Sequence, residues 1–290
     1  MPSDQVESPT RPPELTRRDF VRTTVGSGFA AAVLPVTAQT IKTDSTGLTV
    51  GEISIPVGDF KMPAYRAMPA SKSMLPVVLV VSEVFGVHEH IADVARRFAK
   101  LGYLAIAPEL FERQGDAQSY GEIDKLIKEV VSKAPDAQVM GDLDACVVWA
   151  KANGGDTSKL GITGFCWGGR ITWLYTAHNP GARAGVAWYG RLVGAANALQ
   201  PKHPIDVVAN LAGPVLGLYG GDDSGIPQDS VDAMNAALAK GNAAAKKSQI
   251  VVYAGAPHAF HADYRPSYRK EPSDDGWKRC VAWFKANGVV

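Results

Sequence analysis

The sequence has 290 residues, of which 46% are hydrophobic and 20% charged, and this composition is that of an ordinary globular protein. Its 30 basic and 29 acidic residues leave a formal net charge of +1, which excludes the basic surface typical of nucleic-acid-binding proteins. Three cysteines are too few for a disulfide scaffold, and no apolar run reaches the roughly 18 residues that a membrane span needs. We therefore expect no nucleic-acid partner and no membrane span in the mature chain.

Residues 1–38 have the organisation of an export signal. A polar, proline-rich leader precedes the paired Arg17 and Arg18, and the mildly apolar stretch 23–36 follows. The apolar stretch is followed by small residues that end at Ala38, and these provide a cleavage site after Ala38. This order resembles a bacterial twin-arginine signal, so we expect recognition by the export machinery and an exported, periplasmic mature chain. A flexible tail that contains two arginines by coincidence, or an uncleaved membrane anchor, is the alternative.

Residues 39–290 are expected to form a single α/β domain, because apolar runs typical of buried strands alternate with segments of helical periodicity. Strands are predicted at Pro76–Ser82, Tyr103–Ala107, Leu160–Phe165, Ala184–Tyr189, Pro214–Tyr219 and Gln249–Tyr253. Helices are predicted at His90–Lys100, Val139–Ala152, Arg170–Ala177, Pro227–Leu238 and from about Ser273 onward. This alternation predicts a mostly parallel central sheet with helices on both faces, which binds ligands at the carboxyl ends of its strands.

The turn Gly164–Gly168, of sequence GFCWG, lies between a predicted strand and a predicted helix. It has the form of a nucleophile elbow in which Cys166 takes the place of the usual serine. The glycines permit a tight turn that exposes the central side chain, and the start of the next helix favours an anion there. A buried structural cysteine in a glycine-rich turn is the alternative.

Two later turns contain an acid and a histidine. Asp222 and Asp223 follow one predicted strand, and His258 follows the last. The order cysteine, aspartate, histidine is the order of a hydrolase triad, in which the histidine takes the nucleophile's proton and the acid fixes its tautomer. Taken singly, aspartates in turns usually cap helices and loop histidines are usually solvated. Their order on these elements favours the triad.

Four segments together resemble the dienelactone hydrolase family, the carboxymethylenebutenolidases. They are residues 164–169 (GFCWGG), 82–87 (SEVFGV), 220–223 (GGDD) and 257–260 (PHAF), and the similarity runs from about Lys42 to the C-terminus. The resemblance implies an α/β-hydrolase fold. It also implies that Cys166 is the nucleophile, His258 the base and Asp223 the acid. Asp222 is disfavoured because the family acid lies four residues before the proline that is Pro227 here.

The resemblance further assigns Glu83 as the family glutamate that shares control of the cysteine's charge. We expect burial and a neighbouring thiolate to raise the pKa of Glu83. A glutamate exposed at a strand end is the alternative. The oxyanion of the reaction would be held by the backbone N–H groups of Trp167 and Val84.

The family binds a lactone that bears a carboxylate, and arginines hold this charge. Arg113 resembles one of them by its segment. Ala262 stands where the second is found in the best-known members, and Arg265 is the candidate replacement. Phe85 and Trp167 are expected either to line the pocket or to be ordinary core aromatics.

The sequence thus predicts a hydrolase of lactone or ester bonds that acts through a thioester, on a small-molecule substrate, with no cofactor. An exported carboxylesterase or thioesterase of other specificity, and a non-catalytic binding protein of the same fold, are the rival interpretations. His88 and His90 lack the spacing of a metal site, so no metal is expected. Cys146 and Cys280 are expected in the core, and a monomer is the expected state.

Overall fold

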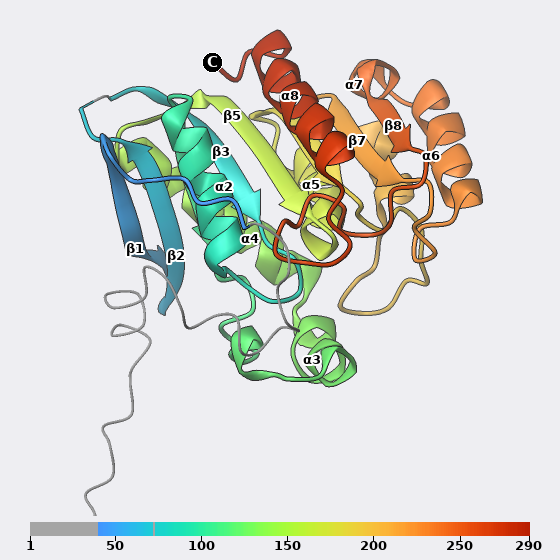
Figure 1. The fold of residues 1–290 in the computed structure, drawn as a ribbon, viewed down its shortest axis with the longest axis horizontal. Helices are drawn as coiled ribbons and strands as arrows, with labels where there is room; N and C mark the ends of the chain where they lie inside the picture. Colours follow the sequence, from blue (N-terminus) through green and yellow to red (C-terminus); the bar gives the residue numbers. More distant parts are fainter. Residues whose placement is uncertain (1–39, 72) are drawn as a thin grey trace, which may run out of the picture. The chain divides into compact units, whose positions relative to one another are not determined.

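An eight-stranded sheet forms the centre of the fold in this computed structural model, which describes residues 40–71 and 73–290 (Figure 1). Its strand order is β1-β2-β4-β3-β5-β6-β7-β8. The strands are β1 (Leu48–Val57), β2 (Phe60–Pro69), β3 (Leu75–Val81), β4 (Leu104–Pro108), β5 (Gly155–Phe165), β6 (Ala182–Trp188), β7 (Val215–Gly220) and β8 (Gln249–Tyr253). The β1–β2 and β2–β4 pairs are antiparallel, and all pairs from β4 to β8 are parallel. The predicted mostly parallel sheet is confirmed.

Helices cover both faces of this sheet, as predicted. They are α2 (Glu89–Lys100), α4 (Asp136–Ala152), α5 (Trp167–His178), α6 (Gln228–Lys240), α7 (Ala243–Lys247) and α8 (Lys270–Ala286), with short 3-10 segments at Ala117–Ser119, Val131–Lys133 and Pro204–Asn210. The short helix α3 (Ile123–Glu129) lies below the sheet in Figure 1, and neither α3 nor α7 is among the helices predicted from the sequence. α2 and α8 lie together on one face, where the rings of Phe98 and Trp277 are 4.8 Å apart (Figure 1). α4 and α5 lie together on the other, where the Tyr175 hydroxyl donates to Asp144 at 3.0 Å.

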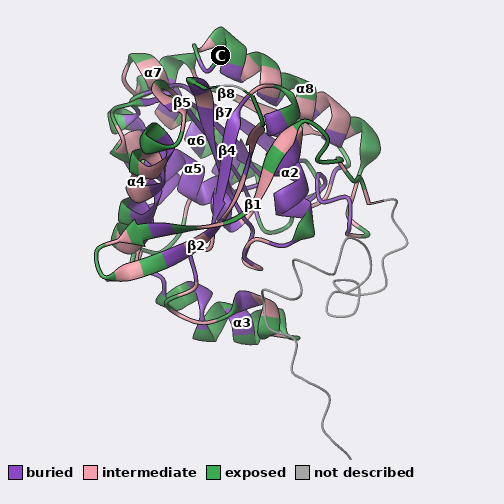
Figure 2. Cartoon of the chain, turned by 90° about the vertical axis from the view of Figure 1, so that its left-hand side faces the viewer, coloured by how far each residue is buried: buried purple, intermediate pink, exposed green. Residues whose placement is uncertain are grey.

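The core follows from the apolar runs of the inner strands. In β3, residues 77–81 are valine or leucine, and each is 0% exposed because helices cover the strand from both sides. On α2, Ile91, Val94 and Phe98 recur at helical spacing and are also 0% exposed. Each such side chain contributes roughly 1.5–3 kcal/mol to folding. Figure 2 shows the result, with buried strands inside and exposed residues on the outer surfaces of the helices.

The hairpin of β1 and β2 is absent from the sequence prediction, which depended on continuous apolar runs. Both strands mix buried, half-buried and exposed residues and contain prolines, Pro56 in β1 and Pro63 in β2. Proline cannot donate to a sheet ladder, and both prolines avoid this demand: Pro56 lies in the edge strand β1, and Pro63 lies just outside the part of β2 that pairs with β4. Gly58, with φ of 57°, makes the turn between the two strands.

The parallel strands bring distant parts of the sequence to one edge of the sheet. β3, β5, β6, β7 and β8 are consecutive neighbours, so the loops after their carboxyl ends are neighbours too. Among the described residues, no helix combines the length and the hydrophobicity needed to cross a membrane. The predicted leader with Arg17, Arg18 and Ala38 lies outside the described residues.

Candidate active site

Cys166 lies at the sharp turn between β5 and α5. Its φ of 53° and ψ of −114° are unusual for a residue with a side chain, and such strain persists only where the surroundings enforce it. The Cys166 N–H donates to the Trp188 carbonyl at 3.0 Å, and its own carbonyl accepts from the N–H of Gly169 at 3.0 Å. These bonds on both sides hold the turn, and the side chain stays partly exposed.

The two glycines of the turn are required by close packing. A Cβ on Gly164 would lie 2.2 Å from the Gly168 carbonyl oxygen. A Cβ on Gly168 would lie 2.4 Å from the carbonyl oxygen of Val81, at the end of β3. Both contacts are with backbone, which cannot move aside without disturbing the sheet. Glycine is therefore what lets α5 begin directly against β3.

His258 and Asp223 are paired beside this turn. The Nδ1 atom of His258 lies 2.6 Å from the Oδ2 atom of Asp223, and the other carboxylate oxygen accepts the Gly225 N–H at 2.9 Å. Asp223 is 4% exposed, whereas Asp222 points to solvent. The structure therefore places Asp223, and not its neighbour, against the imidazole.

The charge state of His258 is set by these neighbours. Burial lowers its pKa, but the hydrogen bond to Asp223 and the interaction with the Cys166 side chain outweigh it and raise the pKa to about 10. His258 therefore stays protonated through neutral pH while both partners are in place. A charged imidazole next to a cysteine favours the thiolate, which is the nucleophilic form.

Glu83 is buried two residues beyond the end of β3. One of its oxygens, Oε2, lies 2.9 Å from His88 Nε2 and accepts a hydrogen bond from the Tyr264 hydroxyl at 3.3 Å. Burial raises the pKa of Glu83, but His88, His90 and Arg265 overcome it, and the pKa falls to about 2. The expectation of a raised pKa is wrong, because the sequence gives no sign that a histidine five residues away turns back onto the carboxylate.

Two backbone N–H groups are left free at the turn. Trp167 is the first residue of α5, so its N–H has no acceptor inside the helix. Val84 follows Glu83 in the adjacent loop, and neither N–H donates to any group in the described part of the chain. Free N–H groups at a helix start, with the helix dipole behind them, suit a negative charge.

A model of the Dienelactone hydrolase family matches residues 62–288. The chain belongs to this family. It is a hydrolase with the α/β-hydrolase fold.

The sequence similarity to related proteins extends over most of the chain. A protein of Methylorubrum extorquens is 61% identical over 278 residues, covering 95% of this chain and 94% of that protein. One of Escherichia coli K12 is 52% identical over 267 residues, covering 92% and 97%. Both are named "Putative carboxymethylenebutenolidase". A crystal structure named "Putative Dienelactone Hydrolase", from Klebsiella pneumoniae, is 57% identical with a TM-score of 0.80, covering 82% of this chain and 98% of that one.

The two arginines predicted to bind substrate have different environments in this hydrolase. Both terminal nitrogens of Arg113 donate to Asp142, at 2.6 and 2.8 Å, and its guanidinium lies 4.1 Å from the centre of the Phe60 ring. A role in binding substrate would require this ion pair to open. Arg265 is half-buried, and its guanidinium lies 5.6 Å from the centre of the Phe85 ring. No carboxylate among the described residues forms an ion pair with Arg265.

The histidines near the site have structural partners. His88 contacts Glu83, and His90 Nδ1 lies 3.0 Å from Asp263 Oδ1. His261 Nδ1 lies 2.7 Å from the Ser273 hydroxyl. In residues 40–71 and 73–290, no three histidine, cysteine or acidic side chains are grouped to hold a metal ion. Cys146 and Cys280 are buried, as expected.

Three residues at the site have no role in the sequence analysis. His88 and Tyr264 bind Glu83, and the ring of Tyr189 lies 5.2 Å from that of His258. Tyr189 could have been found by its place at the carboxyl end of a predicted strand. His88 was considered only together with His90 as a candidate metal ligand, and the spacing of the pair argued against a metal site.

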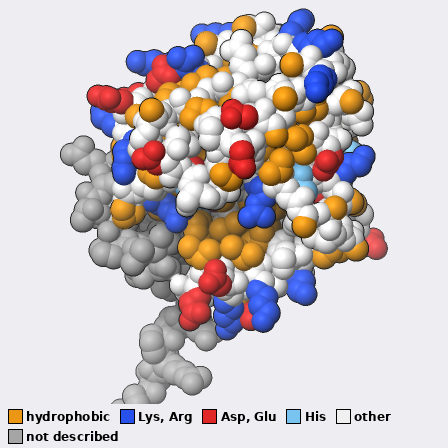
Figure 3. Space-filling view, turned by 90° about the vertical axis from the view of Figure 1, so that its right-hand side faces the viewer, with side chains coloured by type: hydrophobic (Ala, Val, Ile, Leu, Met, Phe, Trp, Pro, Cys, Tyr) orange, Lys and Arg blue, Asp and Glu red, His pale blue; other side chains and the backbone are white. Residues whose placement is uncertain are grey.

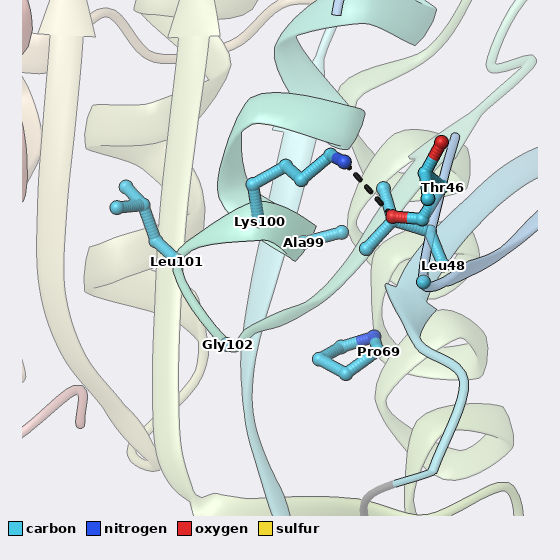
Figure 4. A pocket seen from close by; sticks show the side chains of 8 residues that line it. Thr46, Leu48, Pro69, Ala99, Lys100, Leu101 and Gly102 are labelled. Atoms are coloured by element: carbon cyan, nitrogen blue, oxygen red, sulfur yellow. Dashed lines mark hydrogen bonds between the residues drawn. The ribbon is translucent and has the colours of Figure 1, made fainter. Parts of the chain in front are cut away.

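Two cavities of the described structure are lined by residues other than the triad candidates. One of about 240 Å³ is lined by Leu48, Pro69 and the end of α2, where Lys100 Nζ donates to the Thr46 carbonyl at 2.9 Å (Figure 4). Another, of about 290 Å³, lies beside Trp277 and Arg97. Figure 3 shows the face that carries α6 in Figure 1, where hydrophobic side chains gather in a hollow beside basic ones. Neither of these two cavities contains Cys166 or His258 in its lining.

Proposed function

We propose that the chain hydrolyses lactone or ester bonds through a Cys166–His258–Asp223 triad, with a thioester intermediate and no cofactor. The observation that carries this proposal is the pairing of His258 with the buried Asp223 at 2.6 Å, beside a cysteine held in a strained elbow. The membership of the dienelactone hydrolase family supports the substrate class, since lactones of this type are what the family name describes.

In the first half of the reaction, the Cys166 thiolate attacks the carbonyl carbon of the substrate. A C–S bond forms, and the negative charge moves to the carbonyl oxygen, where the N–H groups of Trp167 and Val84 stabilise it. When the carbonyl re-forms, the C–O bond to the leaving group breaks. His258 gives its proton to the departing oxygen, and Asp223 keeps the imidazole oriented.

In the second half, water cleaves the thioester. His258, now neutral, takes a proton from the water as its oxygen attacks the same carbon. The C–S bond then breaks, the acid leaves, and the Cys166 thiolate is restored beside a protonated His258. The net reaction adds one water to one ester bond. A thiolate nucleophile suits a substrate whose leaving group is a stable enolate. The tetrahedral intermediate then expels the enolate rather than the thiolate, so the reaction proceeds to the thioester.

Glu83, Phe85 and the arginines complete the proposed site. Arg265 binds a carboxylate on the substrate, and Phe85 supplies an apolar wall beneath the guanidinium. Arg113 remains a prediction as a second ligand. Glu83 holds a negative charge close to Cys166, and a change in its hydrogen bonds on substrate binding adjusts the charge of the thiol.

The test is hydrolysis of a dienelactone and of 4-nitrophenyl acetate by the full chain and by Cys166→Ala. We expect the wild type to turn over the dienelactone and the variant to lose at least about 10³-fold in kcat. Turnover of the aryl ester alone, lost with Cys166, would assign a carboxylesterase of other specificity. Undiminished hydrolysis by the variant would overturn the mechanism, and no turnover of either substrate by the wild type would favour a binding protein.

Labelling separates the nucleophile from the other cysteines. Cys146 and Cys280 are fully buried, and burial raises the pKa of both thiols, so they should resist iodoacetamide in the folded chain. Cys166 should be alkylated first, with parallel loss of activity, as followed by peptide mass spectrometry. Equal labelling of all three cysteines would contradict an activated nucleophile.

The export of the chain is a separate proposal that depends on residues 1–38 alone. We propose that Arg17 and Arg18 direct the chain through the twin-arginine route and that cleavage follows Ala38. Replacing both arginines by lysine should keep the protein in the cytoplasm, as measured by cell fractionation. We also propose a monomer, which light scattering would test.

A further inference from the structure

The loops that carry the two halves of the proposed site begin far apart on the sheet. Glu83 and the Val84 N–H follow β3, whereas His258 follows β8. Three strands, β5, β6 and β7, lie between them, and neighbouring strands are about 4.8 Å apart, so β3 and β8 are separated by roughly 19 Å. The sheet alone therefore does not bring His258 to the loop after β3. The two loops must be fixed to each other where they meet.

The loops meet at Asp263, which lies five residues after His258. Its Oδ1 atom lies 3.0 Å from Nδ1 of His90, in the first turn of α2, the helix that follows the loop after β3. The adjacent Tyr264 donates its hydroxyl to Glu83 at 3.3 Å. Asp263 is 0% exposed and His90 is 2% exposed. Two neighbouring residues of one loop thus hold the other loop at two buried points.

Asp263 is also held by groups outside the two loops. Its Oδ2 atom accepts a hydrogen bond from the Arg97 guanidinium at 2.9 Å and another from the Ile41 N–H at 3.2 Å. Burial raises the pKa of Asp263, but His90 and Arg97 outweigh it and keep the pKa below its usual value. The carboxylate is therefore charged at neutral pH, which strengthens its hydrogen bond to His90. Because Arg97 and Ile41 remain when His90 is replaced, the buried charge keeps partners in such a variant.

The segment between His258 and Asp263 is constrained enough to transmit the position of one to the other. The Ala262 N–H donates to the Ala259 carbonyl at 3.0 Å, which closes a tight turn directly after His258. Ala259 has φ of 59°, which residues with a side chain rarely adopt and which the surrounding packing must enforce. Residues 259–263 are each at most 1% exposed. A displacement of Asp263 therefore displaces His258 as well.

We propose that Asp263 and His90 are positioning residues of this hydrolase, whose buried pair fixes the loop of His258 against the loop that follows β3. The inference rests on the proposed function and adds to it two residues that set the geometry of the base without contacting the substrate. Proton transfer by His258 requires hydrogen-bond distance to the reacting oxygen, and a misplacement of about 1 Å costs on the order of 10²-fold in rate. The pair therefore acts on kcat rather than on KM.

Two substitutions of His90 that differ in the hydrogen bond test the proposal. Leucine fills the space but has no donor, whereas the smaller asparagine carries an amide nitrogen near the position of Nδ1 that can donate to Asp263. For His90→Leu we expect kcat on 4-nitrophenyl acetate to fall about tenfold to hundredfold, with KM within about twofold of the wild type. For His90→Asn we expect kcat within about threefold. A role in packing alone would favour leucine over asparagine.

The double variant His90→Leu/Tyr264→Phe tests the attachment at two points. Each single variant keeps one of the two hydrogen bonds between the loops, and the double variant keeps neither. If both bonds hold the same two loops together, the loss of kcat in the double variant exceeds the product of the single losses by at least about threefold. Tyr103→Phe is the matched control, since it removes a buried hydrogen bond, to the Val289 carbonyl at 3.0 Å, that does not join these loops. Its kcat should stay within about twofold.

Several results would overturn the proposal. They are an unchanged kcat in His90→Leu, an equal loss in His90→Leu and His90→Asn, a rise in KM as large as the fall in kcat, and a loss in the double variant no greater than the product. Circular dichroism and urea unfolding establish that each variant is folded. If His90→Leu does not fold, His90→Gln replaces it, because its longer side chain carries the amide past Nδ1.

Alkylation of Cys166 by iodoacetamide separates this proposal from the proposed function, because it needs no turnover. A protonated His258 held beside Cys166 favours the thiolate. At neutral pH the alkylation rate should therefore fall at least about threefold in His90→Leu and stay near that of the wild type in His90→Asn. An unchanged or higher rate in His90→Leu overturns the positioning role whether or not an ester is hydrolysed. Ester hydrolysis that survives Cys166→Ala overturns only the proposed nucleophile.

Discussion

The Nε2 atom of His88 lies 2.9 Å from the Oε2 atom of Glu83, and both side chains are 1% exposed. The turn that brings them together contains Gly86, with φ of 72°, where a Cβ would lie 2.6 Å from Oε2 of Glu109. A buried carboxylate is tolerated only when it is paired. The pair therefore keeps a negative charge in the floor of the site, two residues from the end of β3.

Removing one member of this pair should be costly. For His88→Leu we expect the free energy of unfolding to fall by about 3–5 kcal/mol at neutral pH, because the Glu83 carboxylate loses its main partner. The double variant His88→Leu/Glu83→Gln should recover much of the loss, since no charge remains to be compensated. Urea unfolding of the wild type, His88→Leu, Glu83→Gln and the double variant measures this double-mutant cycle. A loss below about 1 kcal/mol for His88→Leu would contradict the assigned pairing.

The pair should also make stability fall in acid. The pKa of Glu83 is lowered from its ordinary 4.5 to about 2, so the folded state prefers the ionised form. This contribution is fully present above pH 4.5 and disappears as the pH falls toward 2. The stability difference between the wild type and Glu83→Gln should therefore shrink across that interval. Unfolding curves at several pH values would check this, and a difference independent of pH would disprove it.

Asp222 and Asp223 form a natural comparison, since they are adjacent and only Asp223 contacts His258. Asp223→Asn should lower kcat by about 10²–10⁴-fold, because the amide no longer fixes the tautomer and charge of the imidazole. Asp222→Asn should leave kcat within about twofold, as its side chain is exposed. Steady-state kinetics on one ester decides this, and similar losses in both variants would refute the assignment of Asp223.

The imidazole of His258 should titrate near pH 10 in the free enzyme, well above its ordinary value of 6.5. Its contribution to stability is fully present below pH 6.5 and is lost as the pH rises through about 10. Solvent screens part of this effect, since the side chain is 37% exposed. An NMR titration of the ring would measure the midpoint. Asp223→Asn should lower it, and an unchanged midpoint would show that the carboxylate has no influence.

Gly168→Ala should destabilise the elbow, because the added methyl would meet the Val81 and Ser82 carbonyl oxygens at 2.4 and 2.6 Å. A loss of about 2–4 kcal/mol is expected from overpacking against backbone. Gly141→Ala, within α4 and with open space around it, should instead stabilise by up to about 1 kcal/mol through helix propensity. Thermal or urea unfolding compares the two, and equal effects would contradict the close approach of α5 and β3.

The sequence by itself determined the order of the elements and the chain order of Cys166, Asp223 and His258. Local patterns are enough for these, because an apolar run reports burial and flanking glycines report a tight turn. The same reasoning missed β1 and β2, whose residues mix buried, half-buried and exposed positions and include prolines, and it missed the short helices α3 and α7.

Only the tertiary structure decided which charges meet. Glu83 pairs with His88, which reverses the expected direction of its pKa, and Arg113 pairs with Asp142, 29 residues away. The hydroxyl of Tyr189 has no partner among the described residues, and no periodicity predicts that. Such contacts depend on how separate loops pack at the carboxyl ends of neighbouring strands. A sequence pattern reports the surroundings of a residue along its own helix or strand, and says little of what packing brings beside it.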